Sequence, residues 1–282
     1  MLAQNDFLAQ AKIGNNQPWR YVVGMILVLL ALLIFSIPQV LVTDIKGGYP
    51  TVASHWYLLV AIGSFAGGIL MLWVWLKNSH HRAFQTLITP QSSVNWKRVV
   101  SSAAVWLVCT AIVEFGMYLV FPEMYRFTWN PQQWLPAFIV GFLFLPIQTS
   151  CEELIFRGYL FQAIGSRNVV AGLVISSVFF GLMHSANPET AKVGFGLAMT
   201  YYIGVGLFFA LLTYFDGKLE LALGIHASNN IYAFLFVTYP DSALPSPSVI
   251  TMTELNFPLM IIGWLLAVVL YTVTIKWVFR WI

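Results

Sequence analysis

Residues 21–43 read YVVGMILVLLALLIFSIPQVLVT, a run that contains no charged side chain. A helix needs about 20 apolar residues to cross the roughly 30 Å hydrocarbon core of a bilayer, so this run predicts a membrane-spanning helix. Similar runs follow along the chain, at 56–76, 99–121, 135–162, 169–185, 194–215, 219–237 and 258–279. The sequence therefore predicts an all-α, polytopic membrane bundle of about eight transmembrane helices.

The composition agrees with a chain that lies mostly within lipid. Hydrophobic residues make up 59% of the chain, charged residues only 9%, and the mean hydropathy is +0.77. Soluble domains carry about 25% charged residues, so this chain could not cover its surface in water. The net charge of +3 is too small to indicate a nucleic-acid partner. The two cysteines, Cys109 and Cys151, lie in apolar runs and predict no disulfide framework.

The positions of Lys and Arg predict the orientation in the membrane, because cytoplasmic loops are enriched in both. Residues 1–20 are polar and predict a solvent-exposed cytoplasmic tail. With eight spans and an inner N-terminus, ten basic residues fall on the inner side and three on the outer side. We therefore expect both termini in the cytoplasm of a multi-pass protein of a bacterial inner or plasma membrane. The inner residues are Lys12, Arg20, Lys77, Arg82, Lys97, Arg98, Arg167, Lys218, Lys276 and Arg280; the outer ones are Lys46, Arg126 and Lys192.

Several ionisable side chains lie inside the predicted spans, where each costs several kcal/mol and so marks a candidate functional residue. A single such residue is often a structural polar group with a satisfied partner, but a fold does not need this many of them to pack. The set is Glu114, Glu152, Glu153, Arg157, His184 and His226, with Asn230 as a polar companion.

Helical spacing separates the roles of these residues. Glu153 and Arg157 stand four residues apart on one helix face, which suits an ion pair. Glu152 lies about 100° further around the helix and has no predicted partner nearby in the sequence. His226 and Asn230 are also four apart, so both can face one cavity.

This combination of groups predicts hydrolysis of an amide bond. A carboxylate beside an imidazole can take a proton from water and so activate it as a nucleophile. The candidates for this pair are Glu152 and His184, while His226 and Asn230 supply hydrogen-bond donors of the kind that a tetrahedral oxyanion needs.

Three motifs in this region resemble those of a known family. Glu152-Glu153-x-x-x-Arg157, Phe180-x-x-x-His184 and His226-x-x-x-Asn230 are similar to the motifs of the CAAX protease and bacteriocin-processing (CPBP) family. This family is also called the abortive-infection family and includes the type II CAAX prenyl endopeptidases. Each motif is weak alone, whereas the three in order, each on a predicted span, are specific.

The resemblance implies an intramembrane endopeptidase that acts on a membrane protein or peptide substrate. It implies that Glu152 and His184 activate water and that His226 and Asn230 bind the oxyanion. We expect this reaction to require no cofactor, with zinc as the alternative. Glu153, Arg157 and Phe180 are implied as supporting residues. The resemblance places the catalytic core at 135–237, after accessory helices at 21–134 and before an outer loop and last helix at 238–282.

Three alternatives remain open from the residues. Two histidines and a carboxylate can hold zinc, so a metal site of Glu152, His184 and His226 is chemically reasonable. The polar cluster could instead belong to a non-catalytic scaffold or immunity protein, or to a transporter. The protease motifs HExxH, GxSG and GxGD are absent. Glu114 lies outside the motifs, and His80 and His81, in a basic loop, are expected to be solvated.

Overall fold

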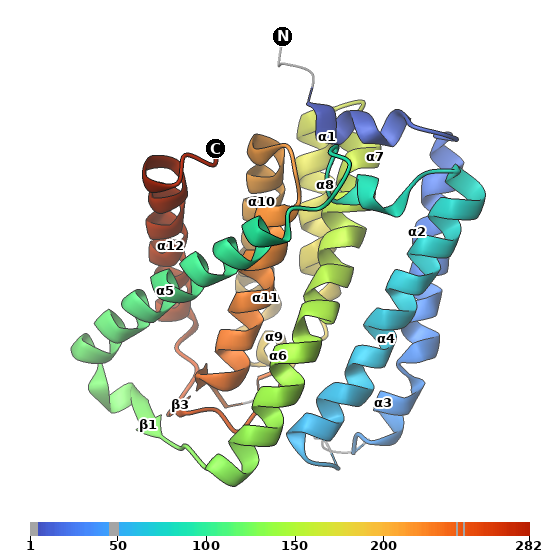
Figure 1. Cartoon of the computed structure of the whole chain (residues 1–282). Helices are drawn as coiled ribbons and strands as arrows, with labels where there is room; N and C mark the ends of the chain where they lie inside the picture. The colour runs from blue at the N-terminus through green and yellow to red at the C-terminus, as the bar shows by residue number, and fades with distance from the viewer. Residues whose placement is uncertain (1–4, 45–50, 241, 245) are drawn as a thin grey trace.

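The protein folds as a bundle of helices that run between two ends of the molecule (Figure 1). The computed structural model describes residues 5–44, 51–240, 242–244 and 246–282. The long helices are α2 (Pro18–Phe35), α4 (Ser54–Trp75), α5 (Trp96–Val120), α6 (Pro131–Glu153), α8 (Val169–Met183), α10 (Phe195–Asp216), α11 (Glu220–Leu235) and α12 (Phe257–Val273). Shorter helices are α1 (Asp6–Ala9), α3 (Ile37–Leu41), α7 (Gln162–Gly165) and α9 (Pro188–Val193).

Each of the eight predicted spans is helical, which confirms the all-α fold class. Within the described residues, six segments are long and apolar enough to cross a membrane: Pro18–Leu41, Ser54–His80, Trp96–Val120, Pro131–Gly165, Phe195–Asp216 and Phe257–Val278. Helix α8 is apolar but shorter, with 15 residues, and α11 has 16. The count of about eight crossings therefore stays a prediction.

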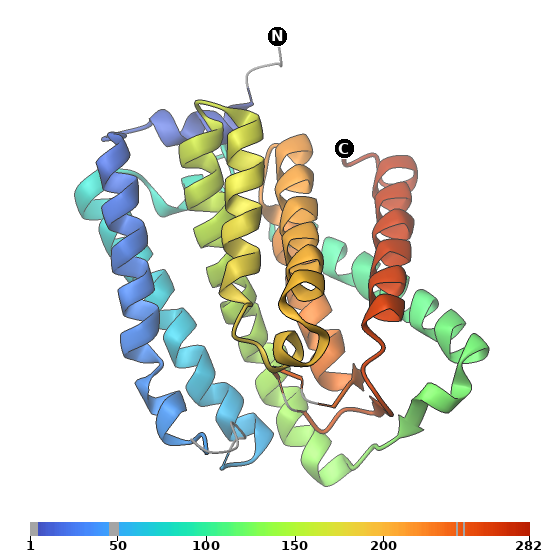
Figure 2. The same ribbon diagram turned by 180° about the vertical axis from the view of Figure 1, so that it is seen from behind.

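Helix α11 occupies the interior of the bundle, where it packs against α5 and α6 (Figures 1 and 2). Ten of its 16 residues are buried within the protein. Gly224 allows the close approach to α5, since a Cβ atom there would lie 2.3 Å from the Val99 carbonyl oxygen. This packing buries His226.

Helix α6 does not end at Glu153 but continues through a π-helical segment, Leu154–Phe161, into α7. Single π-turns within α-helices occur frequently at functional sites because they change which face a side chain presents. The predicted pair of Glu153 and Arg157 lies across this change from α- to π-helix.

A small three-stranded sheet lies at the end of the bundle away from α1 and from the end of α12 (Figure 1). Strand β3 (Ile250–Met252) pairs antiparallel with β1 (Tyr125–Phe127) and parallel with β2 (Val237–Thr238). No strand was predicted here, since segments of two or three residues are too short to show a periodic pattern. The sheet connects the loop before α6 to the segment that joins α11 and α12.

Two expectations about the end of the bundle that carries α1 are wrong. The described part of the predicted solvent-exposed tail contains α1, whose Phe7 is fully buried. His80 is also fully buried rather than solvated. Its Nδ1 lies 2.7 Å from the Asn15 carbonyl and its Nε2 lies 2.9 Å from the Tyr159 hydroxyl. His81 is exposed, as predicted.

Candidate functional site

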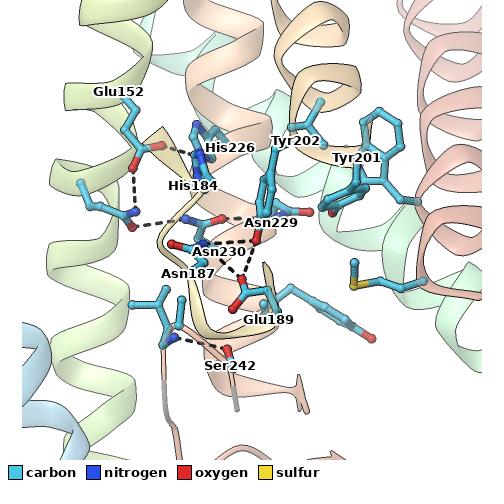
Figure 3. A pocket seen from close by; sticks show the side chains of 18 of the residues that line it. Glu152, His184, Asn187, Glu189, Tyr201, Tyr202, His226, Asn229, Asn230 and Ser242 are labelled. Carbon is cyan, nitrogen blue, oxygen red and sulfur yellow. Dashed lines mark hydrogen bonds and ion pairs between the residues drawn. The ribbon is translucent and has the colours of Figure 1, made fainter. Parts of the chain in front are cut away.

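A cavity of about 500 Å³ lies within the bundle and is lined by residues of α4, α5, α6, α8, α10, α11 and α12. The four residues predicted to be catalytic all line it, namely Glu152, His184, His226 and Asn230. Their side chains meet where α6, α8 and α11 come together (Figure 3). The fold thus brings three separate motifs to one cavity.

Behind the cavity wall, Glu153 and Arg157 form the ion pair that their spacing predicts. Arg157 Nη1 donates to Glu153 Oε1 at 2.9 Å, and both side chains are fully buried. Arg157 Nη2 also donates to the Gly206 carbonyl at 3.0 Å, and its guanidinium carbon lies 4.3 Å from the centre of the Phe180 ring. Arg157 thereby links α10 to the π-helical segment.

Glu153 has a second partner, which the spacing does not predict. Its Oε1 lies 2.8 Å from Nδ1 of His226. Because an ionised carboxylate only accepts hydrogen bonds, this contact assigns a proton to Nδ1 and leaves Nε2 as the nitrogen that faces the cavity. His226 Nε2 lies 3.6 Å from Glu152 Oε2. The two adjacent glutamates thus contact opposite nitrogens of one imidazole.

Glu152 also has a partner close in sequence, contrary to expectation. Gln148 Nε2 donates to Glu152 Oε1 at 2.9 Å. Gln148 stands one helical turn before Glu152, a spacing that could have indicated the contact. The other carboxylate oxygen of Glu152, Oε2, is buried and accepts no hydrogen bond from the described residues.

Gln148 connects Glu152 to Asn230 across the cavity. Asn230 Nδ2 donates to Gln148 Oε1 at 3.2 Å, so one amide side chain bonds to both residues (Figure 3). Asn230 Oδ1 in turn accepts from Asn229 Nδ2 at 3.4 Å. As predicted from their spacing, His226 and Asn230 face the same cavity.

His184 is the C-cap residue of α8, and its ring contacts both the backbone carbonyl and the ring of Phe180. Nδ1 lies 2.8 Å from the Phe180 carbonyl, which can only accept, so Nδ1 carries a proton. Nε2 forms no hydrogen bond with the residues that the structure describes. The Phe180 ring lies 4.7 Å from the His184 ring and 6.0 Å from that of His226, as the motif implies. Among the described residues, no hydrogen bond or ion pair joins His184 directly to Glu152.

Two acidic residues outside the motifs also line the cavity. Glu114 of α5 accepts a hydrogen bond from the Tyr125 hydroxyl at 2.7 Å. Glu189 of α9 is 2% exposed and accepts hydrogen bonds from Tyr202 and Asn187. Sequence reasoning missed Glu189 because it lies between two predicted spans, where a carboxylate is ordinarily solvated.

The zinc alternative needs Glu152, His184 and His226 to converge on one point. In the part of the chain that the structure describes, no group of three or more His, Cys, Asp or Glu residues is arranged to hold a metal ion. His226 Nδ1 is bonded to Glu153, so only its Nε2 faces Glu152.

Comparison with known proteins identifies the family. A family model for type II CAAX prenyl endopeptidase Rce1-like proteins matches residues 131–232, a stretch that contains all seven motif residues. The uncharacterized protein YyaK of Bacillus subtilis (strain 168) is 31% identical in an alignment that covers 89% of each chain. No solved structure gives a significant match. The chain belongs to the Rce1-like family.

Proposed function

We propose that this chain is an intramembrane endopeptidase that hydrolyses peptide bonds of membrane protein or peptide substrates with a water activated by Glu152 and His184. The observation that carries the proposal is the state of Glu152 Oε2, which is buried at the cavity and accepts no hydrogen bond from the described residues. A buried carboxylate oxygen without a donor is costly to maintain, so its natural partner is a ligand or a water molecule.

The first step needs a base and a second group that orients the water. Glu152 Oε1 is held by Gln148, which leaves Oε2 to accept a proton from the water. His184 presents Nε2 to the same cavity because its Nδ1 is bonded to the Phe180 carbonyl. A water bonded to both atoms would be placed and deprotonated as it attacks the carbonyl carbon of the substrate.

The second requirement is stabilisation of the oxyanion, for which we propose His226 and Asn230. Asn230 Nδ2 carries two hydrogens and gives one to Gln148, so the other is available to the oxyanion. His226 Nε2 donates to the oxyanion when both ring nitrogens carry a proton, and Nδ1 then donates to Glu153. Donors fixed in place before the reaction stabilise the tetrahedral intermediate without further reorganisation.

The proton balance of the reaction closes within these residues. Glu152 takes one proton from water as the new carbon–oxygen bond forms, and the carbonyl oxygen becomes the oxyanion. The proton then passes from Glu152 to the leaving nitrogen as the carbon–nitrogen bond breaks. One peptide bond and one water give a carboxylic acid and an amine, and the site returns to its first state.

The test compares the peptides released in membranes that contain the wild-type protein, Glu152→Ala or Glu123→Gln. Glu123 is an exposed carboxylate outside the cavity and serves as the matched control. We expect a set of cleavage products that is present with the wild type and Glu123→Gln and absent with Glu152→Ala. The expression host should be a bacterium, since we place the protein in a bacterial plasma membrane. Identical peptide sets for all three proteins would contradict the proposal.

A further inference from the structure

The ring of His184 is stacked on Tyr202, a residue of α10 outside the three motifs. The ring centres lie 4.4 Å apart and the planes meet at 20°, which is a parallel stack. Phe180 is a second ring neighbour, and its ring is tilted by 44° to that of His184. The stacking contact with Tyr202 therefore restrains the plane of the His184 imidazole.

Tyr202 is itself held at its far end by Glu189. The Tyr202 hydroxyl donates to Glu189 Oε1, and Asn187 Nδ2 lies 3.2 Å from both the Tyr202 oxygen and Glu189 Oε1 (Figure 3). Burial and then the negative charge of Glu189 raise the pKa of the neighbouring Tyr239, so that phenol stays protonated beside the carboxylate. Glu189 thus lies in a small polar cluster that fixes the Tyr202 ring.

The chain segment around Glu189 also holds the backbone of His184. The backbone N–H of Asn187 donates to the His184 carbonyl at 3.1 Å, and the Thr190 hydroxyl donates to the same oxygen at 3.0 Å. His184 has φ −95° and ψ 3°, outside the regular helix, so α8 alone does not fix its orientation. Residues 187–190 and Tyr202 therefore hold both the backbone and the ring of His184.

We propose that Tyr202 and Glu189 are positioning residues, which hold His184 Nε2 at the point where the water must be bound. The inference rests on the proposed function, because it assigns these residues a task in that reaction. Neither residue needs to contact the reacting atoms. A displacement of about 1 Å in a catalytic group can lower a rate by roughly a hundredfold, so small shifts of the ring should be measurable.

The kinetic test separates the effect of the ring stack between Tyr202 and His184 from that of the hydrogen bond between Tyr202 and Glu189. Tyr202→Phe keeps the ring but loses the hydrogen bond to Glu189, and we expect kcat to fall by roughly tenfold, as one lost hydrogen bond implies. Tyr202→Leu removes the stack as well, and we expect kcat to fall by about a hundredfold or more. KM should stay close to that of the wild type in both. Tyr214→Phe, a tyrosine of the same helix outside the cavity, is the control.

The double variant tests whether the two residues act through one bond. Tyr202→Phe removes the hydrogen bond to Glu189, and Glu189→Gln removes the charge that strengthens it. If both residues act through this bond, the double variant should be no slower than the slower single variant. If the fold-decreases in kcat of the two single variants multiply in the double variant, the two residues do not act through this one hydrogen bond. Wild-type kcat in both Tyr202→Phe and Tyr202→Leu would overturn the whole inference.

A spectroscopic measurement keeps this inference separate from the proposed function. The chain has five histidines, so ¹³C labelling of His Cε1 gives few signals, and His184→Gln assigns the one of interest. We expect the His184 signal to move in Tyr202→Phe and Glu189→Gln and to lose its ring-current shift in Tyr202→Leu. An unchanged signal in all three would overturn the positioning role. Absence of any Glu152-dependent cleavage by the wild type would instead overturn the proposed function.

Discussion

Glu153 Oε1 lies 2.8 Å from His226 Nδ1 and 2.9 Å from Arg157 Nη1, so one buried carboxylate oxygen joins two of the three motifs. The adjacent Glu152 reaches the other nitrogen of His226, at 3.6 Å. The two glutamates therefore differ in their environment although they are neighbours in sequence. Glu153 is fully buried and paired with a cation, whereas Glu152 is 9% exposed and lines the cavity.

This difference predicts unequal effects on stability. Glu153→Gln leaves the fully buried Arg157 without its counter-ion, and breaking such a pair typically costs about 3–5 kcal/mol of unfolding free energy. Glu152→Gln breaks no ion pair with Arg or Lys and should leave stability close to that of the wild type while cleavage is lost. Thermal unfolding in detergent measures both. An equal loss of stability in the two variants would contradict this division of roles.

The orientation of the bundle can be tested at the two ends of α5. Cys109 and Cys151 are buried, so a new exposed cysteine should be the main site of labelling by a thiol reagent. Ser92 and Glu123 are exposed and lie before and after α5. We expect Glu123→Cys to react with a membrane-impermeant reagent in intact cells, and Ser92→Cys to react only after permeabilisation. The opposite pattern would reverse the proposed orientation.

The sequence predicts those features that depend on patterns within one helix. Apolar runs locate the helices because lipid requires long apolar segments. The spacing of Glu153 and Arg157 predicts their ion pair because residues four apart share a helix face. The contact between Glu153 and His226 joins helices whose relative rotation depends on packing across the whole bundle, and no local pattern encodes that.

Other features were missed for reasons that differ from residue to residue. His80 follows Lys77 and precedes Arg82, a context typical of a solvated loop, but a π-helical last turn places its ring inside the bundle. Glu189 lies in a connecting segment, and tertiary packing, including that of α9 against α10, buries it. Gln148 could have been found, since it lies one turn before Glu152.

Gln148 should affect catalysis through both of its hydrogen bonds. Gln148→Leu removes the donor to Glu152 and the acceptor for Asn230, and we expect kcat to fall by at least about tenfold. Gln148→Glu keeps the acceptor for Asn230 but places a second carboxylate beside Glu152. If the donation to Glu152 matters, Gln148→Glu should be as slow as Gln148→Leu. Substantial recovery of kcat in Gln148→Glu would show that Gln148 acts only by orienting Asn230.

The last prediction concerns metal dependence. If Glu152 and His184 activate water directly, peptidase activity should survive exhaustive chelation, and purified active protein should contain far less than one zinc per chain. His226→Gln should retain some activity, because the glutamine amide still offers a hydrogen-bond donor to the oxyanion. A site in which Glu152, His184 and His226 bind zinc would behave differently. In that site, His226→Gln would remove one of three protein ligands and with it most of the zinc affinity. The bound zinc ion would polarise the substrate carbonyl in place of the hydrogen-bond donors.

Metal analysis and kinetics of the same preparations distinguish the two mechanisms. Wild type, His226→Gln and the exposed-site control Glu123→Gln are purified in parallel, assayed before and after chelation, and measured for zinc content. Glu123→Gln should match the wild type in both zinc content and activity, because its side chain is exposed and lies outside the cavity. Stoichiometric zinc in the active wild type, lost in His226→Gln together with all activity, would assign His226 to a metal site. His226 would then not be an oxyanion donor, and its contact with Glu153 Oε1 would orient a metal ligand, as hydrogen bonds to zinc-bound histidines commonly do.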